Sequence, residues 1–421
     1  MSLTSPLPFR LTRALHADGE RRVYLVDPRG LEDDYSSLYI TSSLRGAGLS
    51  VASHEQALAS INVLCGFCLE RDIDLLSRFK AGQYLATNEC IALADFAQNS
   101  FGAEYKQHQK VVALGKVRRG YTYAMPAVAR DTRHKRLTHI AEFVNWLGKY
   151  LLTGSSRERV RQIEEMRDEI LRRRPAAGSA RDDFDVQHFT PQDNERLNRL
   201  IAPGTSGNPF TEGVQLRNLL VIEILRQTGV RIGEALNLKV RDIDHVKREM
   251  TVRRRHDAIE DPRIDQPLVK TDGRVIPLSP FLTDLVVQYV ALRRSVPGAK
   301  KHQYLLVTHK AGPSQGQPMT QGAIDSMFET IAGADEQLSH VTAHKFRHFF
   351  SSELAGEQLT QGTDPNSREL HRRTRNYIAG RKAHSEVDST YTEYDTKRQA
   401  RKAMLAVQEK MAPAITARSS S

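Results

Sequence analysis

Apolar residues recur at helical spacing through much of the first half of the chain, beginning near Ser53. Ser53 and Gln56 have the spacing of a capping box, and two further amphipathic runs cover residues 86–98 and the stretch that follows Lys135. This pattern predicts a small all-helical domain over residues 46–155. The apolar faces are formed by Leu58, Ile61, Leu64, Cys65 and Cys68 in the first run and by Leu137, Ile140, Phe143, Val144 and Leu147 in the third.

The second half of the chain shows signals for both helices and strands. Thr190 and Pro191 form a good helix start, residues 217–227 are strongly apolar, and Gly229 can take the left-handed conformation that ends a helix. Residues 249–253 alternate as a strand does. Residues 270–278 predict a hairpin whose turn is Asp-Gly. We therefore expect a mixed α/β domain over residues 190–412.

Three other segments complete the domain plan. Residues 1–45 are predicted to be an N-terminal extension with one short strand, and residues 413–421 a polar tail. Residues 156–175 interleave opposite charges three and four positions apart, which is typical of a helix with a solvated face. A Pro- and Ala-rich linker follows this charged helix.

Composition narrows the function classes. The 421 residues carry 61 Lys and Arg against 50 Asp and Glu, a net charge of +11 that favours a polyanionic partner. Three cysteines argue against a disulfide framework, and the CxxC pair Cys65 and Cys68 fits helix packing better than metal binding. No apolar run is long enough to span a membrane, and no signal peptide is evident. We expect a cytoplasmic, nucleoid-associated protein.

Several scattered residues suggest chemistry on a phosphodiester. Arg231 follows a helix end, where it must pair with a carboxylate such as Glu234 or bind an anion. His344 and Arg347 are three apart, so a helix places them on one face. Lys270 precedes the predicted Asp-Gly turn, and it is either an ordinary exposed lysine or one that contacts a bound backbone.

In this order the motifs resemble those of the tyrosine recombinases, the phage integrase family. The resemblance covers residues 190–405, and the preceding helical region fits the core-binding, DNA-clamping domain of the family, here residues 46–180 with the charged linker helix. It implies a mainly α fold with a small β-hairpin or sheet in the catalytic domain. The matching motifs are Thr228-Gly229-x-Arg231-x-x-Glu234, Lys270 on a hairpin, His344-x-x-Arg347, and Ile378-Ala379-Gly380-Arg381 followed by a tyrosine.

One position departs from the family pattern. The residue after Gly380 is usually His or Trp in the family, and here it is Arg381, which can still donate hydrogen bonds to a phosphate. A slip of three residues would instead give this role to His384. Spacing from Gly380 favours Tyr391 as the nucleophile, whereas spacing from His384 favours Tyr394. We predict Arg381 and Tyr391.

The resemblance also implies roles for the site residues. Arg231 and Arg347 would hold the non-bridging phosphate oxygens, and Lys270 would protonate the leaving 5′ oxygen. His344 would handle the tyrosine proton or assist the phosphate. Tyr391 would form a 3′-phosphotyrosyl bond, and no metal, nucleotide or other cofactor is implied.

The expected partner is double-stranded DNA at specific sites. Family members work as homo-tetramers on two duplexes, with a dimer on each site, and exchange a carboxy-terminal helix for which residues 397–411 are the candidate here. Accessory directionality factors fit the same picture, as does a role in moving a mobile genetic element. Two alternatives remain open: a type IB topoisomerase, and a non-catalytic DNA-binding protein on an integrase fold.

Overall fold

The computed structural model describes residues 7–46, 49–101, 127–152, 156–176, 188–255, 258–267, 273–359, 365–380 and 389–411. Inside helices it describes only the backbone at 356–359, 365–368, 379 and 389–399. The chain divides into two compact units, one built almost wholly from residues 1–184 and the other from residues 185–421. Each unit has its own hydrophobic core.

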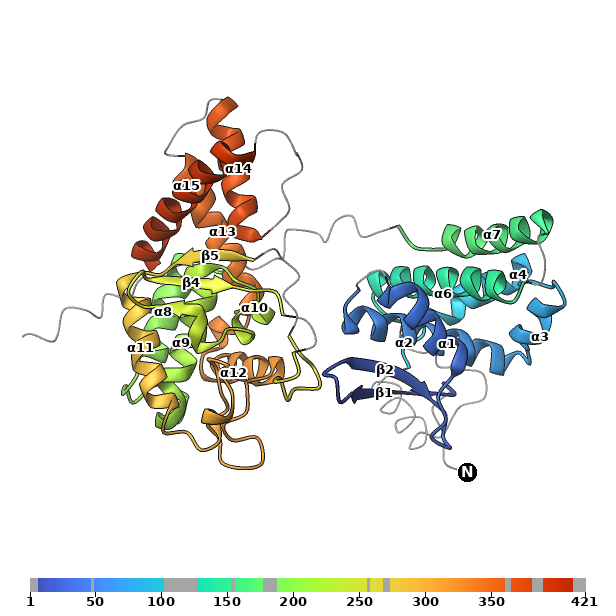
Figure 1. The fold of residues 1–421 in the computed structure, drawn as a ribbon, viewed down its shortest axis with the longest axis horizontal. Coiled ribbons are helices and arrows are strands. Elements are labelled where there is room, and N and C mark those ends of the chain that lie inside the picture. Colours follow the sequence, from blue (N-terminus) through green and yellow to red (C-terminus); the bar gives the residue numbers. More distant parts are fainter. Residues whose placement is uncertain are drawn as a thin grey trace, which may run out of the picture. The chain divides into compact units, whose positions relative to one another are not determined.

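The first unit joins an antiparallel β-ribbon to a group of helices (Figure 1). Val23 and Leu25 of the ribbon are buried in the same core as Leu58 and Phe67, so the amino-terminal segment packs with the helices that follow it. The elements are β1 (Arg10–Leu15), β2 (Arg21–Val26), α1 (Asp34–Tyr39), the π-helix η1 (Ile40–Arg45), α2 (Val51–Glu70), α3 (Leu75–Lys80), α4 (Thr87–Phe96), α6 (Arg130–Tyr150) and α7 (Arg157–Arg172).

The predicted helical runs of this unit are confirmed as α2, α4 and α6, with one correction at a helix start. All five residues predicted for the apolar face of α6 are buried. Helix α2, however, begins one turn earlier than the capping box suggested, because Ser50 is its N-cap and accepts a hydrogen bond from the Ser53 amide at 3.3 Å. Ser50 was overlooked because the apolar pattern starts only after it.

The charged helix α7 is not solvated on every side. Its residues Ile163, Met166 and Ile170 are buried, and the opposite side carries ion pairs such as Arg161 to Glu158 at 3.0 Å. Helix α7 packs against α6 and so closes the core of the first unit. In α2, burial raises the pKa of the Cys68 thiol to about 12, which fits a packing role.

The second unit is centred on α9 (Glu212–Thr228), a helix buried on nearly all sides. A helix with this burial belongs inside a core, and α9 packs against α11, α13 and α15. The predicted start at Thr190 is confirmed, since Thr190 caps α8 in a reciprocal capping box with Asp193. The remaining helices are α8 (Pro191–Ile201), α10 (Ile232–Leu236), α11 (Pro280–Arg293), α12 (Gln321–Ala334), α13 (Ala343–Leu359), α14 (Pro365–Ala379) and α15 (Ser389–Met411), with short 3-10 turns η3 (Val240–Asp242), η4 (Ala299–Lys301) and η5 (Glu336–Leu338).

A three-stranded antiparallel sheet of β3 (Ile243–Asp244), β4 (Glu249–Val252) and β5 (Arg274–Pro277) completes this unit. Met250, Val252 and Ile276 are buried in the core beside α9, while alternate residues face α14 and α15. The strand predicted at 249–253 is confirmed. Strand β5 pairs with β4 across a long connection, and residues 268–272, which include most of the predicted Asp-Gly turn, lie outside the described residues.

The molecule is therefore mostly helical with small antiparallel sheets, as the sequence predicted. Among the residues that the structure describes, no helix has the length and apolar character needed to cross a membrane.

Candidate active site

The turn between α9 and α10 presents Arg231. Gly229 ends α9 in the left-handed region, with φ of 61°, and Arg231 is the N-cap of α10. The Glu234 carboxylate accepts a hydrogen bond from the Arg231 backbone amide at 2.9 Å, which fixes the start of α10. The Arg231 side chain remains 39% exposed. The turn is thus rigid at its backbone while its guanidinium group can be reached from outside.

Glu234 makes its short side-chain ion pair with Arg274 and not with Arg231. Arg274 on β5 donates two hydrogen bonds to the buried Glu234 carboxylate, at 3.1 and 2.8 Å, whereas the Arg231 guanidinium lies 3.6 Å away. A buried carboxylate needs such a paired cation, because an uncompensated charge in the core is costly. Arg274 is therefore the closer cationic partner of Glu234, and Arg231 is the more distant one.

Helix α13 carries the predicted histidine and arginine on one face, as expected. Phe346 and Phe350 of α13 are buried in the core, whereas His344 is exposed and Arg347 is half-buried. The Arg347 guanidinium donates a 2.6 Å hydrogen bond to the backbone carbonyl of Gly229. Since Gly229 lies two residues before Arg231, this bond brings both predicted arginines to the same turn.

Gly229 also lets α13 approach the turn closely. A β-carbon at this position would lie 2.4 Å from Cδ1 of the buried Phe350 ring. Only a glycine combines the positive φ with this contact. The position of Arg347 against the turn thus depends on Gly229 having no side chain.

We expect Gly229→Ala to destabilise the second unit by about 3 kcal/mol, from backbone strain together with overpacking against Phe350. Far-UV circular dichroism during urea unfolding would show a transition at lower denaturant. Fluorescence of Trp146, the single tryptophan of the chain, reports on the first unit and would keep its midpoint. Gly213→Ala in α9 is the matched control, because nothing lies within 4 Å of the added carbon. Equal midpoints for the two variants would contradict the close-approach argument.

His344 is paired with a second histidine on the same helix. The Nε2 atoms of His344 and His348 are 2.9 Å apart, and the two rings meet edge to face. Burial of the His348 imidazole and the nearby charges of His344, His188 and Arg347 lower the pKa of His348 below its ordinary value. The lowered pKa favours the neutral form of the His348 ring.

Two of the six predicted site residues lie outside what the structure describes, and only the backbone of a third, Tyr391, is described. Lys270 and Arg381 fall in undescribed segments, as does the alternative His384. Tyr391 and Tyr394 both lie in α15, of which only the backbone is described there. The structure thus brings Arg231 and Arg347 to one turn and places His344 on the helix of Arg347.

The connection from β4 toward Lys270 is anchored near α10. Arg255 donates to both carboxylate oxygens of Asp242, at 2.6 and 2.8 Å. Arg263 is buried, where it pairs with Asp261 and donates to the backbone carbonyl of Leu236, the last residue of α10, at 3.2 Å. These contacts tie the connection to the helix that begins beside Arg231.

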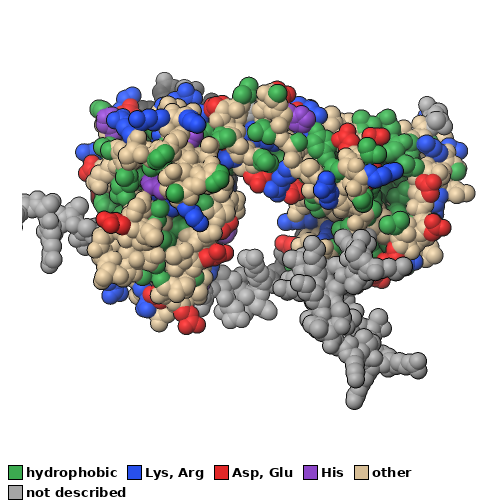
Figure 2. Space-filling view, turned by 90° about the horizontal axis from the view of Figure 1, so that it is seen from below, with side chains coloured by type: hydrophobic (Ala, Val, Ile, Leu, Met, Phe, Trp, Pro, Cys, Tyr) green, Lys and Arg blue, Asp and Glu red, His purple; other side chains and the backbone are tan. Residues whose placement is uncertain are grey.

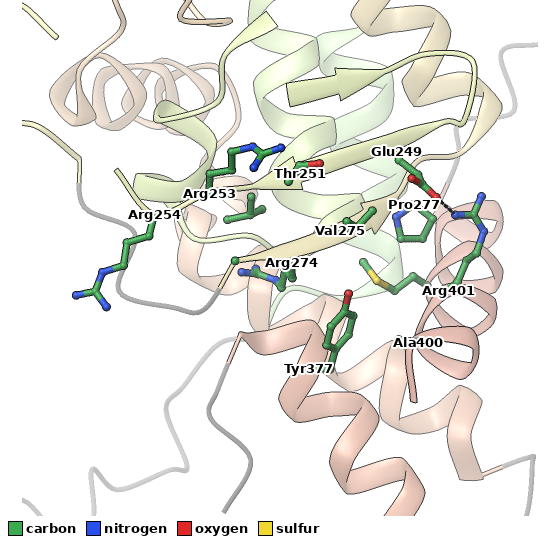
Figure 3. A pocket seen from close by; sticks show the side chains of 13 residues that line it. Glu249, Thr251, Arg253, Arg254, Arg274, Val275, Pro277, Tyr377, Ala400 and Arg401 are labelled. Atoms are coloured by element: carbon green, nitrogen blue, oxygen red, sulfur yellow. Dashed lines mark hydrogen bonds and ion pairs between the residues drawn. The ribbon is translucent and has the colours of Figure 1, made fainter. Parts of the chain in front are cut away.

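A cavity of about 1010 Å³ lies between the sheet and the two last helices (Figure 3). Arg253, Arg254 and Arg274 line it from the sheet side, and Tyr377 of α14 points its hydroxyl group toward β5. Arg401 of α15 forms a 2.5 Å ion pair with Glu249 of β4 at one end. The cavity borders Gly273, where the described chain resumes after Lys270.

Helix α15 packs on its own domain in this structure. Ala400, Ala403, Met404 and Val407 are buried in the core of the second unit, and Gln408 donates to the Pro277 carbonyl at 2.9 Å. From the sequence alone, residues 397–411 could pack either on their own domain or on a neighbouring subunit. The single chain shows the first arrangement.

Basic side chains extend beyond the two arginines at the turn. Figure 2 shows Lys and Arg side chains gathered with histidines along one edge of the face of the second unit that it presents. This unit therefore combines a positively charged edge with a rigid turn that carries two arginines and a helix that carries a histidine pair. Guanidinium groups at a surface of this kind are chemically suited to contact phosphate oxygens.

Residues 191–362 match the family model described as the phage integrase family. Through this domain the chain is similar to the tyrosine recombinases. The match contains Arg231, Lys270, His344 and Arg347, and it ends before Arg381 and both candidate tyrosines.

Curated relatives carry the same family name. The chain is 25% identical over 183 residues to the tyrosine recombinase XerC of Staphylococcus haemolyticus (strain JCSC1435), which covers 42% of this chain and 50% of that protein. It is 24% identical over 178 residues to XerC of Staphylococcus aureus (strain USA300 / TCH1516), with 42% and 49% covered. The chain spans about half the length of the curated relatives it matches.

Solved structures of recombinases are also similar. The crystal structure of XerA recombinase is 15% identical, with 90% of this chain and 98% of that chain covered and a TM-score of 0.31. The Tn1549 transposon integrase in complex with transposon right end DNA is 16% identical, with 75% and 100% covered and a TM-score of 0.34.

Sequence reasoning missed three features of the site. Arg274, the partner of Glu234, follows the Asp-Gly pair and was treated only as part of a hairpin. His348 stands next to Arg347 and four positions after His344, a spacing that predicts contact on a helix. No sequence pattern indicates that Gly229 leaves room for the Phe350 ring, because the contact joins residues far apart in the chain.

Proposed function

We propose that this protein is a site-specific DNA recombinase that cleaves and rejoins DNA strands through a 3′-phosphotyrosyl intermediate. The observation that supports this most is the 2.6 Å hydrogen bond from Arg347 to the Gly229 carbonyl, which holds Arg347 beside the turn of Arg231. Two guanidinium groups at one rigid turn suit the two non-bridging oxygens of a phosphodiester. The match of residues 191–362 to the phage integrase family model and the net charge of +11 support this function.

In the proposed reaction, the tyrosine oxygen attacks the scissile phosphorus in line with the 5′ oxygen. The P–O5′ bond breaks as the P–O(Tyr) bond forms, so one phosphodiester replaces another and no ATP is needed. Lys270 gives a proton to the departing 5′ oxygen, and His344 takes the tyrosine proton or supports the phosphate. Arg231 and Arg347 offset the negative charge that grows at the transition state. No metal enters this scheme.

The proposed assembly is a homo-tetramer on two duplexes, with one dimer on each recombination site. Residues 397–411 remain the candidate for exchange between subunits, and such exchange would require α15 to leave the contacts of Arg401 and Gln408. Integration or excision of a mobile element is the proposed setting. This function places the protein with DNA, in a cytoplasmic and nucleoid-associated location.

A library of nicked suicide duplexes with randomised sequence tests the function directly. A nick close to the cleavage site lets the short 5′-terminated fragment diffuse away, so a covalent protein–DNA adduct accumulates. We expect an adduct on a narrow set of sequences, without added metal and in the presence of a chelator. Peptide mapping of the adduct identifies the tyrosine, and sequencing gives the site and the polarity.

Other outcomes separate the alternatives. Relaxation of any supercoiled plasmid, with no sequence preference, would favour a type IB topoisomerase. DNA binding without any adduct across the library would favour a non-catalytic DNA-binding protein on the same fold.

A further inference from the structure

The histidine pair on α13 has a geometry that ordinary exposed histidines lack. The 2.9 Å separation of the Nε2 atoms of His344 and His348 is a hydrogen-bond distance, so one ring must donate and the other accept. The backbone of α13 sets this contact, since residues four apart on a helix are neighbours. Both rings are exposed at the surface that carries Arg347.

The surroundings of His348 favour one direction for this bond. His344 and Arg347 come from the same helix, and His188 comes from the segment before α8. All three bear or can bear positive charge, and together with burial they lower the pKa of His348. The lowered pKa favours a neutral His348 ring, which has a lone pair with which to accept the hydrogen bond.

The hydrogen bond that one ring nitrogen of a histidine makes sets the tautomer of the ring. It therefore decides whether the other ring nitrogen can donate or accept a proton. If Nε2–H of His344 donates to His348, Nδ1 is the nitrogen of His344 that remains to act on a substrate. In active sites that activate a nucleophile, the base is often oriented by a third group in the same way. His348 touches no reacting atom in this arrangement and acts through His344.

We propose that His348 is a positioning residue whose Nε2 accepts the Nε2–H of His344 and so fixes the nitrogen that His344 presents to DNA or to the tyrosine. This inference rests on the proposed function for its effect on cleavage. The hydrogen bond itself can be tested without DNA.

The first test is NMR of the full chain with 15N-labelled histidine. The wild-type protein should show a downfield Nε2–H proton on His344, assigned by its absence in His344→Gln. His348→Ala should lose this signal, whereas His348→Gln keeps an acceptor and should retain it. Ser352→Ala, an exposed position one turn further along α13, is the control and should change nothing. A signal that persists in His348→Ala overturns the proposal.

The second test follows adduct formation on the duplexes selected from the nicked library. His348→Ala should slow adduct formation about tenfold, a part of what a positioned acid–base group contributes. DNA affinity should stay at the wild-type value, and His348→Gln should recover most of the rate. A wild-type rate in His348→Ala contradicts a positioning role. Absence of any wild-type adduct would instead refute the proposed function, while the NMR result still decides the hydrogen bond.

Discussion

Tyr391→Phe should bind DNA as the wild-type chain does and form no covalent adduct on a nicked duplex. The substitution removes only the phenolic oxygen, which is the atom that attacks phosphorus in the proposed reaction. Without this oxygen no phosphotyrosyl bond can form, so the expected loss is complete and not a fixed factor. The reference pKa of tyrosine is about 10, and the neighbouring site must therefore help to remove its proton.

The control for this prediction is Tyr394→Phe, three positions further along α15. Adduct formation should survive in Tyr394→Phe, because only one hydroxyl group can lie in line with the scissile bond. Gel-shift assays would confirm that both variants bind DNA equally. If Tyr391→Phe forms the adduct and Tyr394→Phe does not, the alignment through His384 is the correct one and the nucleophile is Tyr394.

The sequence predicted those parts of the fold whose signals are local. The buried face of α6, the capping box at Thr190 and the glycine end of α9 each follow from residues within one or two turns. The shared face of His344 and Arg347 follows from helical spacing in the same way. Local periodicity and capping residues were sufficient to predict these helices and their ends, and the tertiary contacts agree with them.

Long-range pairing could not be predicted in the same manner. Strand β5 pairs with β4 across a long connection, although its neighbouring Asp-Gly pair is a strong local turn signal. Arg274 and Glu234 are 40 positions apart in the chain, so the sequence offered only the nearby Arg231 as a partner for Glu234. Ion pairs between distant residues leave no periodic trace, so the sequence predicted the Arg231–Glu234 contact and could not add Arg274 as the closer partner.

The α15 arrangement links the fold to the proposed reaction. The carboxy-terminal part of α15 is held to the sheet by buried apolar residues, the Arg401–Glu249 ion pair and Gln408. Its amino-terminal part carries both candidate tyrosines. Any movement that exchanges this helix between subunits would therefore also move the nucleophile, so assembly and cleavage would be coupled mechanically.

Arg347→Ala and Arg231→Ala should each slow adduct formation by about a hundredfold or more. Each substitution removes donors that offset negative charge at the transition state, and a low-dielectric site makes such donors more effective than they are in water. Single-turnover cleavage of the selected duplexes measures the effect separately from DNA binding. Arg372→Ala on α14 is the matched control, because it removes an exposed arginine that is ion-paired to Glu369, and it should cleave normally.

Arg347 has a second role that the same experiment can separate. Its hydrogen bond to the Gly229 carbonyl also holds α13 against the turn, so Arg347→Ala is expected to loosen this contact as well. Arg347→Lys keeps the positive charge and one donor but loses the planar fork, so its stability should remain close to wild type while its cleavage rate falls. Urea unfolding and cleavage rates, measured on both variants, distinguish the two effects. Near-normal cleavage by Arg347→Ala would remove this arginine from the active site.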